Sequence, residues 1–560
     1  MGTSADGPRA PVAATPGMVG DFPLLVERKP PGLVRRYFQT QQHVLGLIFG
    51  GIAAWVRTRS APHPRGYGLA RLAAALAWPW LDRELRELPF PVQLRRRLEI
   101  LGPTYIKLGQ VLSLREDILP PKITDELKNL LDRLPAVPLE RLAQIIEKDL
   151  GRPVATMFEW IDPVPLGSAS IGQTHAARTR EGDDVVLKVV KPGNRELLRR
   201  DTVLLNLLGR FLQSFLERFQ PQKVLREFTD YTQRELDLRR EADNAETFAA
   251  NFKDIPDVVF PAIYRQYSGR DVLCMEFLRG FKPSSPAARQ LAEAERDKLL
   301  DLGAAAIIRM LYKDGFFHAD LHPGNLIILP GSRVGFIDLG MVGRFTEELR
   351  RTLMYYYFCL VTGDSENAAR YLALVAQPLR GGDPAGFRRE VEEICRRWAR
   401  ASSFREFSLA QLILNSVAQG VRFRMYFPVE LVLMVKALVT FEGVGQMLKP
   451  GFDVAAVSQR HVNQIFLEQF SPLRIAKEGL RGAPELVDAL TKAPMLLSEG
   501  LRWIEATTRR PQENPLAGLH GAIFAGACLI AGAILAAFKA AWYLWAPLFA
   551  LGALLALRRR

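Results

Sequence analysis

One long apolar stretch near the C-terminus limits most strongly how this chain can fold. From Leu516 to Leu557 the only strongly polar side chains are those of His520 and Lys539. A helix needs about 20 apolar residues to cross a bilayer, so this stretch is long enough for two crossings. We therefore expect two transmembrane helices, 516–538 and 540–557, joined near Lys539, whose long side chain can reach the membrane interface.

Positive charge flanks both ends of this stretch. Arginines stand before and after it, at Arg502, Arg509, Arg510, Arg558, Arg559 and Arg560. Because cytoplasmic flanks are enriched in basic residues, both ends are expected on the cytoplasmic side of a two-pass hairpin. The alternative is a buried hairpin of a soluble domain, which is less favoured because such helices rarely lack a polar face over this length.

A second apolar segment, 44–56, is too short to span a bilayer. Arginines flank it as well, at Arg35, Arg36, Arg57 and Arg59. The segment is expected to be either an interfacial helix whose arginines meet anionic lipid or a core helix, and the pattern does not separate the two.

Composition narrows the class of protein. The 560 residues carry a net charge of +14, with 48% hydrophobic and 24% charged residues, which predicts a sizeable packed core rather than a disordered chain. The positive charge favours an anionic partner such as membrane phospholipid or a phosphorylated ligand. Nucleic acid is the poorer choice because no nucleic-acid-binding signature is present.

The cysteines and the N-terminal segment exclude further classes. Four scattered cysteines with no Cys-x-x-Cys pair argue against a zinc site or a disulfide scaffold and favour a reducing compartment. Residues 1–32 are rich in Pro, Gly and Ala and have no apolar core. We expect them to form a flexible tail rather than a secretory signal.

Hydrophobic periodicity between these regions changes from helical to strand-like and back. Helices are predicted over 94–114 with a break near Gly102, and over 127–134, 139–150, 201–213, 223–251 and 299–312. Strands are predicted over 185–190, 258–263 and 272–277, and the chain is expected to be helical from Phe345 to about Leu480.

Two neighbouring segments in the middle of the chain carry the clearest chemistry. Asp320 is followed five residues later by Asn325, and Asp338-Leu339-Gly340 begins thirteen residues after that asparagine. In protein kinases a loop Asp orients the attacking group, while the Asn and the Asp of Asp-x-Gly hold Mg²⁺ against the nucleotide phosphates. The order and spacing therefore predict a nucleotide site.

A lysine upstream fits the same interpretation. Lys188 lies inside an apolar, strand-like run, where a cation is costly unless it is paired. In kinase-like folds such a lysine bridges the nucleotide phosphates and a helix glutamate. The following helix offers Glu235, Asp237 and Glu241, of which Glu241 is a good candidate.

Two further segments stand where a nucleotide would need them. Gly167, Ser168, Ala169 and Ser170 precede the strand of Lys188, and small residues allow backbone to approach phosphate closely. The strand that contains Glu276 suits a hinge whose backbone pairs with adenine. Each segment alone would be a common turn or strand, and only its position makes it informative.

The same loops lack what a protein-phosphorylating enzyme uses. Ala319 stands where ordinary protein kinases carry an arginine, and a helix is expected to begin near Thr346, which leaves no room for a long activation loop. Protein substrates are therefore disfavoured. His318 and His322 are expected to fix the loop by hydrogen bonds rather than to bind a metal.

At this level of detail the chain resembles the UbiB family of atypical kinase-like proteins. Lys107-Leu108-Gly109-Gln110 resembles the family's Lys-x-Gly-Gln signature, and Glu235-Leu236-Asp237 its Glu-x-Asp motif. The segment 167–170 is similar to its Ala-rich nucleotide loop, and the loops of Asp320 and Asp338 are similar to its catalytic and metal loops. The resemblance covers residues 94–450.

The resemblance implies an α+β, atypical protein-kinase-like bilobal fold with a helical N-terminal extension and a C-terminal transmembrane helical hairpin. The implied parts are a tail (1–32), a basic helical region (33–93), an extension carrying Lys107 (94–150), a kinase-like N-lobe (151–280), a helical C-lobe (281–480), a linker (481–515) and two transmembrane helices (516–557).

The resemblance also implies roles for individual residues. Lys107 and Gln110 would cover the nucleotide pocket, with Lys107 paired to Glu235 or Asp237. Lys188 would pair with Glu241 and act with Asp320 in catalysis on ATP or ADP, while Asn325 and Asp338 would hold Mg²⁺. Gly167 and Ser168 stand where the family often has Ala, which leaves nucleotide preference and the stiffness of that loop open.

The implied function is a membrane-anchored, Mg²⁺–ATP-dependent ATPase or small-molecule kinase that supports ubiquinone biosynthesis. It would lie at the bacterial inner membrane with its catalytic domain in the cytoplasm. Its expected partners are ATP, anionic phospholipid and isoprenoid quinone precursors; other quinone-biosynthesis proteins and a homodimer through the membrane helices stay open.

Two other functions compete with this one. The chain could be a nucleotide-binding pseudokinase scaffold that organises quinone-biosynthesis enzymes or lipids. An aminoglycoside-type phosphotransferase ranks last, because it would need neither Lys107 and Gln110 nor membrane helices.

Overall fold

The structure is a computed structural model of the chain. It describes residues 18–19, 22–23, 32–58, 67–78, 82–113, 119–130, 135–214, 220–400, 409–452, 454–469, 530, 533, 546–547 and 549–550. The chain divides into two compact units, Met1–Glu468 and Gln469–Arg560. The predicted transmembrane helices lie almost entirely outside the described residues, so the two-pass hairpin stays a prediction.

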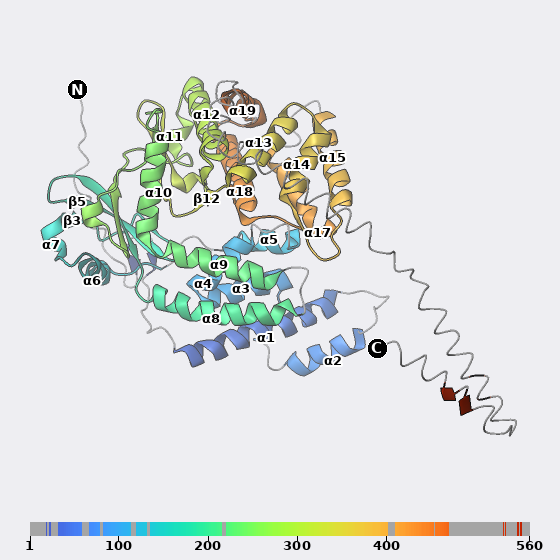
Figure 1. Ribbon diagram of the computed structural model, residues 1–560. Coiled ribbons are helices and arrows are strands. Elements are labelled where there is room, and N and C mark those ends of the chain that lie inside the picture. The colour runs from blue at the N-terminus through green and yellow to red at the C-terminus, as the bar shows by residue number, and fades with distance from the viewer. Residues whose placement is uncertain are drawn as a thin grey trace. The chain divides into compact units, whose positions relative to one another are not determined.

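A small antiparallel sheet forms one part of the first unit (Figure 1). Its strands are β3 (Phe158–Ile161), β4 (Gly167–Ser168), β5 (Gly172–Thr179), β6 (Asp184–Val190) and β8 (Val272–Glu276), in the order β3-β5-β6-β8 with β4 beside β5. Helices α6 (Leu139–Leu150) and α7 (Val154–Met157) pack against it. The apolar run predicted over 185–190 is therefore a strand.

The two faces of this sheet pack against different partners. Val185, Leu187 and Val189 point to a core shared with α6. Val186 and Val190 point to the other face, toward α10 (Leu238–Asn251). Because side chains alternate along a strand, Lys188 shares the face that is turned toward α10.

Below the sheet in the view of Figure 1 lies a layer of helices drawn from two distant parts of the chain. It consists of α1 (Leu33–Thr58), α2 (Tyr67–Ala77), α3 (Phe90–Leu101), α4 (Pro103–Leu112), α5 (Pro121–Leu127), α8 (Asn194–Gln213) and α9 (Pro221–Glu235). Leu98, Tyr105, Leu205 and Phe228 meet in its core. The segment that carries Lys107 is thus fixed against α8 and α9 rather than against the sheet.

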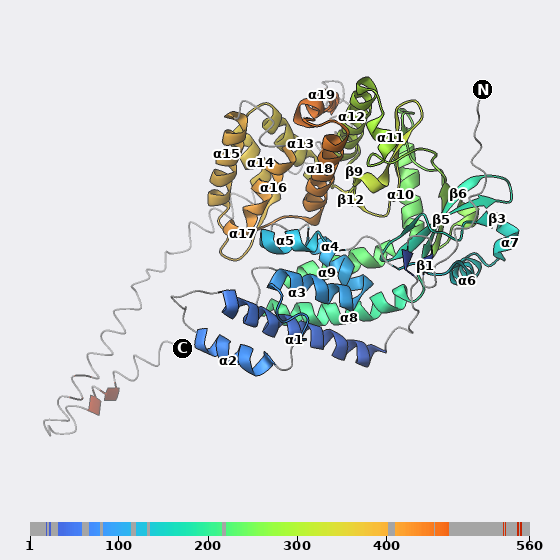
Figure 2. The same ribbon diagram turned by 180° about the vertical axis from the view of Figure 1, so that it is seen from behind.

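The remainder of the first unit is mainly helical, as Figure 2 shows from behind. Its helices are α11 (Pro286–Arg289), α12 (Glu293–Ile308) with a π-helical continuation Arg309–Asp314, α13 (Glu347–Val361), α14 (Ser365–Val375), α15 (Pro384–Arg400), α16 (Leu409–Ala418), α17 (Gly420–Phe423), α18 (Val429–Leu448) and α19 (Val454–Gln469).

Short strands between these helices carry the central loops. The hairpin β10 (Leu326–Leu329) and β11 (Arg333–Phe336) pairs with β7 (Val258–Val259), and β9 (Phe316–His318) pairs with β12 (Val342–Arg344). The other two pairs are β1 (Met18–Val19) with β2 (Phe22–Pro23) and β13 (Gln377–Pro378) with β14 (Met425–Tyr426).

Several predicted boundaries need correction. Of the helix predicted over 127–134, Leu127 ends α5 (Pro121–Leu127), residues 128–130 form a turn, and residues 131–134 lie outside the described residues. The helix predicted over 223–251 is two helices, because Asp237 caps the N-terminus of α10 by accepting a hydrogen bond from the Arg239 N–H. The strand predicted over 258–263 shrinks to β7 and an isolated bridge at Ile263.

Among the described helices, α18 is the one long and apolar enough to cross a membrane. However, 56% of its most apolar window is buried within the first unit, where Leu431, Met434 and Leu438 contribute to the core. We therefore interpret α18 as a core helix.

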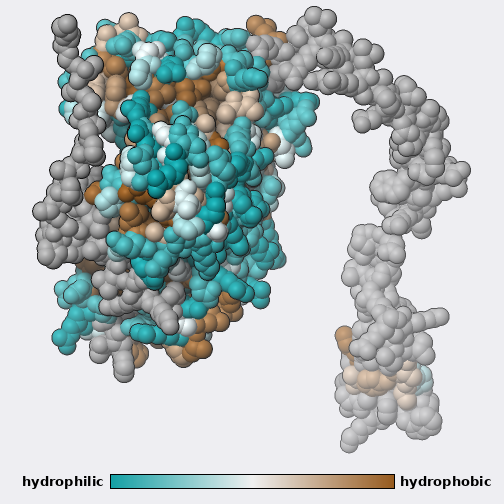
Figure 3. Space-filling view, turned by 90° about the vertical axis from the view of Figure 1, so that its left-hand side faces the viewer, coloured by the Kyte–Doolittle hydropathy of each residue, from teal (hydrophilic) through white to brown (hydrophobic). Residues whose placement is uncertain are grey.

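The segment 44–56 forms the middle and end of α1 rather than a helix of its own. Ala53 and Ala54 are buried, while Leu45, Ile48 and Trp55 are exposed. Apolar side chains of α2 are exposed too, at Leu69, Leu72 and Leu76. Figure 3 shows apolar residues along the lower edge of the molecule, the edge at which α1 and α2 lie in Figure 1.

Candidate nucleotide site

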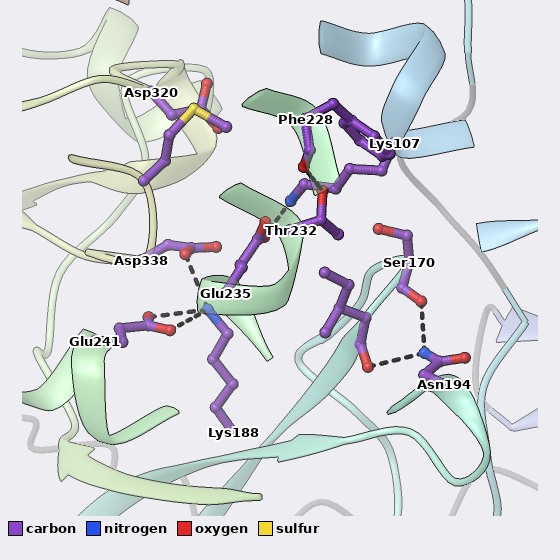
Figure 4. A network of polar contacts seen from close by, with 12 residues as sticks. Lys107, Ser170, Lys188, Asn194, Phe228, Thr232, Glu235, Glu241, Asp320 and Asp338 are labelled. Atoms are coloured by element: carbon purple, nitrogen blue, oxygen red, sulfur yellow. Dashed lines mark hydrogen bonds and ion pairs between the residues drawn. The ribbon is translucent and has the colours of Figure 1, made fainter. Parts of the chain in front are cut away.

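Lys188 lies at the centre of a polar network where the sheet meets the central loops (Figure 4). Its Nζ donates to both carboxylate oxygens of Glu241 at 2.9 Å and to Oδ1 of Asp338 at 2.9 Å. Glu241 belongs to the first turn of α10, and Asp338 follows β11. Strand, helix and loop are thus joined at one ammonium group.

The charges of this network shift one another's pKa. Burial lowers the pKa of Lys188, but the carboxylates of Asp338 and Glu241 outweigh burial and raise it. Burial raises the pKa of Asp338, yet Lys188 outweighs it and the pKa lies below its usual range. Glu241 is buried beside other carboxylates, and its pKa rises to about 7. Asp338 therefore stays ionised at neutral pH.

The backbone at Asp338 has an unusual conformation. Its φ is +55°, in the left-handed region that residues other than glycine seldom adopt. Two contacts hold the segment in place: Asn244 Nδ2 donates to the Leu339 carbonyl at 3.0 Å, and Ile337 N donates to the Asn325 carbonyl at 2.9 Å. Strained backbone of this kind clusters at functional sites, where surrounding contacts maintain it.

The loop of Asp320 is fixed by its two histidines. His318 is buried; its Nδ1 accepts from the Asp320 N–H at 3.0 Å, which leaves Nε2 to donate to the Ile337 carbonyl at 3.3 Å. His322 Nδ1 accepts from the Gly324 N–H at 3.0 Å. Burial lowers the pKa of His318, so this imidazole stays neutral. The prediction that the two histidines fix the loop by hydrogen bonds to backbone or to Asp338 is confirmed, and the partners are backbone groups.

Asn325 and Asp338 offer the oxygen atoms that Mg²⁺ prefers. Asn325 Nδ2 donates to the Asp320 carbonyl at 3.0 Å, which leaves Oδ1 as the acceptor atom of that amide. The side chain of Asp338 is 50% exposed, and Lys188 contacts only its Oδ1. Among the described residues no group of three or more His, Cys, Asp or Glu could hold a metal, and Mg²⁺ in nucleotide sites takes its other ligands from phosphate and water. The donor set fits that kind of ion.

The segment 167–170 is firmly held. Ser168 Oγ donates to the Pro135 carbonyl at 3.1 Å, Lys191 Nζ to the Ala169 carbonyl at 2.7 Å, and Asn194 Nδ2 to the Ser170 carbonyl at 2.8 Å. Gly167 is paired in β4 with Thr174 and has no positive φ. The freedom that glycine could give this loop is therefore not used.

Helix α4, which carries Lys107 and Gln110, lies on the side of the network opposite the strand of Lys188. The Lys107 ammonium forms an ion pair with Glu235 of α9 (Figure 4). Gln110 lies one turn further along α4. Asp237 is not brought to this pair, because its side chain caps α10 and contacts Arg239 at 2.7 Å. Lys107 therefore pairs with Glu235, one of the two partners that the resemblance implied.

Two buried polar atoms beside the network lack a partner among the described residues: the Tyr231 hydroxyl and Glu235 Oε2. Burial and the nearby charges of Glu235, Asp320 and Asp338 raise the pKa of Tyr231 well above its usual range. Since buried polar groups are normally satisfied, these atoms fit a site that takes up a further polar group.

Glu276 is placed differently from the other site residues. It ends β8, and its Oε2 accepts from the Ala262 N–H at 3.1 Å. Its side chain thus stabilises the turn that leads into the strand. Within the part of the chain that the structure describes, no hydrogen bond or ion pair joins Glu276 to the network around Lys188.

Sequence reasoning missed the cation closest to Asp320. Lys436 of α18 places its Nζ 2.7 Å from Asp320 Oδ1. The one available signal was a lysine isolated in an apolar helix. Sequence reasoning also missed Lys191, Asn194 and Asn244, which hold the two loops and belong to no recognised motif.

The fold and this network define an atypical kinase-like protein, and comparison with known proteins agrees. The ABC1 atypical kinase-like domain matches residues 129–372, and the UbiB helical domain matches residues 391–453. Asp320 lies in the first and Lys436 in the second. The chain belongs to the UbiB family.

Sequence relatives support this assignment, and one solved structure is similar to the chain. A protein of Pseudomonas entomophila named "Probable protein kinase UbiB" is 31% identical over 88% of this chain and 94% of its own length. The Pseudomonas putida protein of that name is 31% identical over 72% and 76%. An uncharacterised Synechocystis protein is 35% identical over 66% of this chain, and the match spans 64% of that protein. A solved complex of a Mycobacterium tuberculosis protein with erythromycin is 25% identical, with a TM-score of 0.44 over 63% of this chain and 90% of that chain.

Proposed function

We propose that the protein is a Mg²⁺–ATP-dependent ATPase or small-molecule kinase, anchored in the bacterial inner membrane, that supports ubiquinone biosynthesis. The observation that carries the proposal is the contact of Lys188 with both Glu241 and Asp338, next to the loop of Asp320 and Asn325. In kinase-like sites these groups position the phosphates and the metal. Bound Mg²⁺, held by Asn325 and Asp338, would neutralise charge on the phosphates.

The proposed substrate is small rather than a protein, although relatives carry the name of protein kinase. Only a short stretch separates Asp338 from α13, whose N-cap is Thr346. That stretch contains β12, which is paired with β9, so it leaves no free activation segment. The ion pair between Lys107 and Glu235 lies beside the network, where it would narrow access to a bound nucleotide. A small or lipid-borne acceptor suits such a site better than a peptide.

Gene deletion followed by profiling of isoprenoid quinones tests the pathway. We expect the deletion strain to accumulate a prenylated precursor and to lose the mature quinone. Restoring the wild-type gene should return the profile to normal. An unchanged quinone profile in the deletion strain would contradict the proposed role.

A nucleotide-binding scaffold is the competing function. The observation in its favour is that Lys188 occupies Asp338 Oδ1, an atom that a metal could otherwise use. Complementation of the deletion strain separates the two functions. An enzyme requires Asp338, so Asp338→Asn should fail to restore quinone synthesis at normal protein levels, whereas full restoration would favour the scaffold.

A further inference from the structure

Lys436 occupies an unusual position for a lysine. It lies in α18, whose apolar window has a mean hydropathy of 1.6 and is mostly buried. Its neighbours Val432 and Val435 are 6% and 3% exposed. An ammonium group in such surroundings is costly unless a partner compensates for lost hydration. The partner it meets is Asp320, at 2.7 Å.

The geometry gives each central carboxylate its own lysine. Lys188 of the sheet holds Asp338 at 2.9 Å, and Lys436 of the helical lobe holds Asp320 at 2.7 Å. The Lys436 ammonium also lies 3.7 Å from Met341 Sδ, directly after Asp338-Leu339-Gly340. Lys436 is therefore at the junction of both loops, although neither loop motif contains it.

Lys436 Nζ approaches Asp320 at Oδ1. Oδ2 of Asp320 lies 3.8 Å from His322 Nε2, beyond hydrogen-bond reach. An ammonium group beside Oδ1 restrains the orientation of the carboxylate that would meet a substrate group. This arrangement is what a carboxylate that orients an acceptor requires.

We propose that Lys436 is a positioning residue that orients Asp320 for the reaction. The inference rests on the proposed function and adds a residue from the UbiB helical domain to the catalytic arrangement. The helical domain then has a chemical role at the site as well as a packing role.

The surroundings of Asp320 agree with this role. The titratable groups that face it are Lys436 from α18, Tyr231 from α9, and His318 and His322 from its own loop. Lys436 Nζ lies 2.7 Å from Oδ1, and His322 Nε2 lies 3.8 Å from Oδ2. His318 is buried and neutral, so Lys436 is the nearest cation to this carboxylate.

The test measures ATP turnover in the full-length protein with Mg²⁺, together with nucleotide affinity. In Lys436→Met, which suits an apolar helix, we expect kcat to fall roughly 10- to 100-fold, because a small displacement of a catalytic group has an effect of that order. Nucleotide affinity should stay unchanged, since a loss confined to kcat is the mark of an interaction that acts in the transition state.

Two further variants make the test specific. Lys436→Arg keeps the positive charge and should retain most of kcat. Lys449→Met removes another ion-paired lysine, at the C-terminal end of α18 and 2.7 Å from Asp297, and should change neither kcat nor nucleotide affinity.

Each outcome decides a separate claim. If the wild type turns over ATP and Lys436→Met keeps the wild-type kcat, or loses nucleotide affinity together with kcat, the positioning role is wrong. A kcat of Lys436→Arg as low as that of Lys436→Met would contradict it as well. If the wild type shows no Mg²⁺-dependent turnover, the proposed function itself is wrong, whatever the variants do.

Discussion

Lys188 shares its face of β6 with Val186 and Val190, so the alternation along the strand directs its ammonium toward α10. The Glu241 carboxylate meets it there, and Asp338 adds a second negative charge. A lysine in an apolar strand is costly without such partners. The site thus follows from strand geometry, and the pairing outweighs desolvation at Lys188 and Asp338 but not at Glu241.

Glu241 gives the protein a pH-dependent stability. Its pKa is raised to about 7 in the folded state from 4.5, so its stabilising effect is fully present below pH 4.5 and is lost as the pH rises to about 7. Between pH 4.5 and pH 7 we expect the free energy of unfolding of the nucleotide-free wild type to fall by on the order of 1–3 kcal/mol relative to that of Glu241→Gln. Urea unfolding of both proteins at pH 5 and pH 8 measures the difference, and parallel pH dependences would contradict it.

From the sequence alone, only some of the site residues and few of their contacts could be predicted. The spacing of Lys188, Asp320, Asn325 and Asp338 was enough to predict a nucleotide site. The partner of Lys107 could not be chosen, because Glu235 and Asp237 are close in sequence and only the helix break at Asp237 separates them. Lys436 could not be found, because its relation to Asp320 exists only after α18 has packed.

At the scale of elements, the most buried ion pair joins helices rather than loops. Arg36 of α1 contacts Asp201 of α8 at 2.6 Å, and their side chains are 4% and 0% exposed. Arg36 also donates to the Leu101 carbonyl at the end of α3 at 2.7 Å. One guanidinium therefore fixes three helices of the layer beneath the sheet.

Removing Arg36 should be strongly destabilising. Arg36→Met leaves the Asp201 carboxylate buried without its partner, which is expected to cost about 3–5 kcal/mol. Arg36→Met combined with Asp201→Leu removes both charges and should recover much of that loss. Chemical denaturation of the two variants measures the difference in their free energies of unfolding. Equal stabilities would show that the unpaired Asp201 carboxylate is not what destabilises Arg36→Met.

Asn194 should hold the segment 167–170 in the conformation that covers the proposed nucleotide. Its Nδ2 donates to the Ser170 carbonyl at 2.8 Å and to the Ile171 carbonyl at 3.1 Å. Asn194→Ala removes both hydrogen bonds, each worth about 1 kcal/mol, so we expect ATP affinity to weaken by roughly 5- to 30-fold.

A matched asparagine provides the control for this variant. Asn367 at the start of α14 donates to Asp364 at 2.7 Å and lies outside the site. Calorimetric titration with ATP measures the affinity of both variants, and Asn367→Ala should bind ATP as tightly as the wild type. Equal affinities of wild type and Asn194→Ala would mean that this loop does not contact the nucleotide.

Periodicity located most elements but not how they join. The break at Gly102 and the strand over 185–190 were predictable from the sequence. The helices α8 and α9 were also predictable, yet nothing in their local pattern showed that they pack with α3 and α4. Such contacts depend on the whole fold, whereas periodicity reports only which face of a helix is apolar.

At the scale of the whole molecule, the net charge of +14 and the exposed apolar residues of α1 and α2 agree with a protein that works at a membrane. The proposed anchor is the stretch 516–557. Its arginine flanks predict that both ends stay in the cytoplasm.

Reporter fusions test this topology in the full-length chain. Green fluorescent protein fused after Arg560 should fluoresce, because it stays in the cytoplasm, and alkaline phosphatase there should be inactive. Phosphatase inserted next to Lys539 should be active. An active phosphatase after Arg560 would contradict the two-pass hairpin.

The central claim, a Mg²⁺-dependent nucleotide site built on Asp338, is tested most directly by ATP turnover in Asp338→Asn. The matched control is Asp297→Asn, since Asp297 is 51% exposed and also 2.7 Å from a lysine but lies away from the loops. We expect Mg²⁺-dependent turnover in the wild type and in Asp297→Asn, and its loss in a folded Asp338→Asn. Undiminished turnover in Asp338→Asn would contradict the claim.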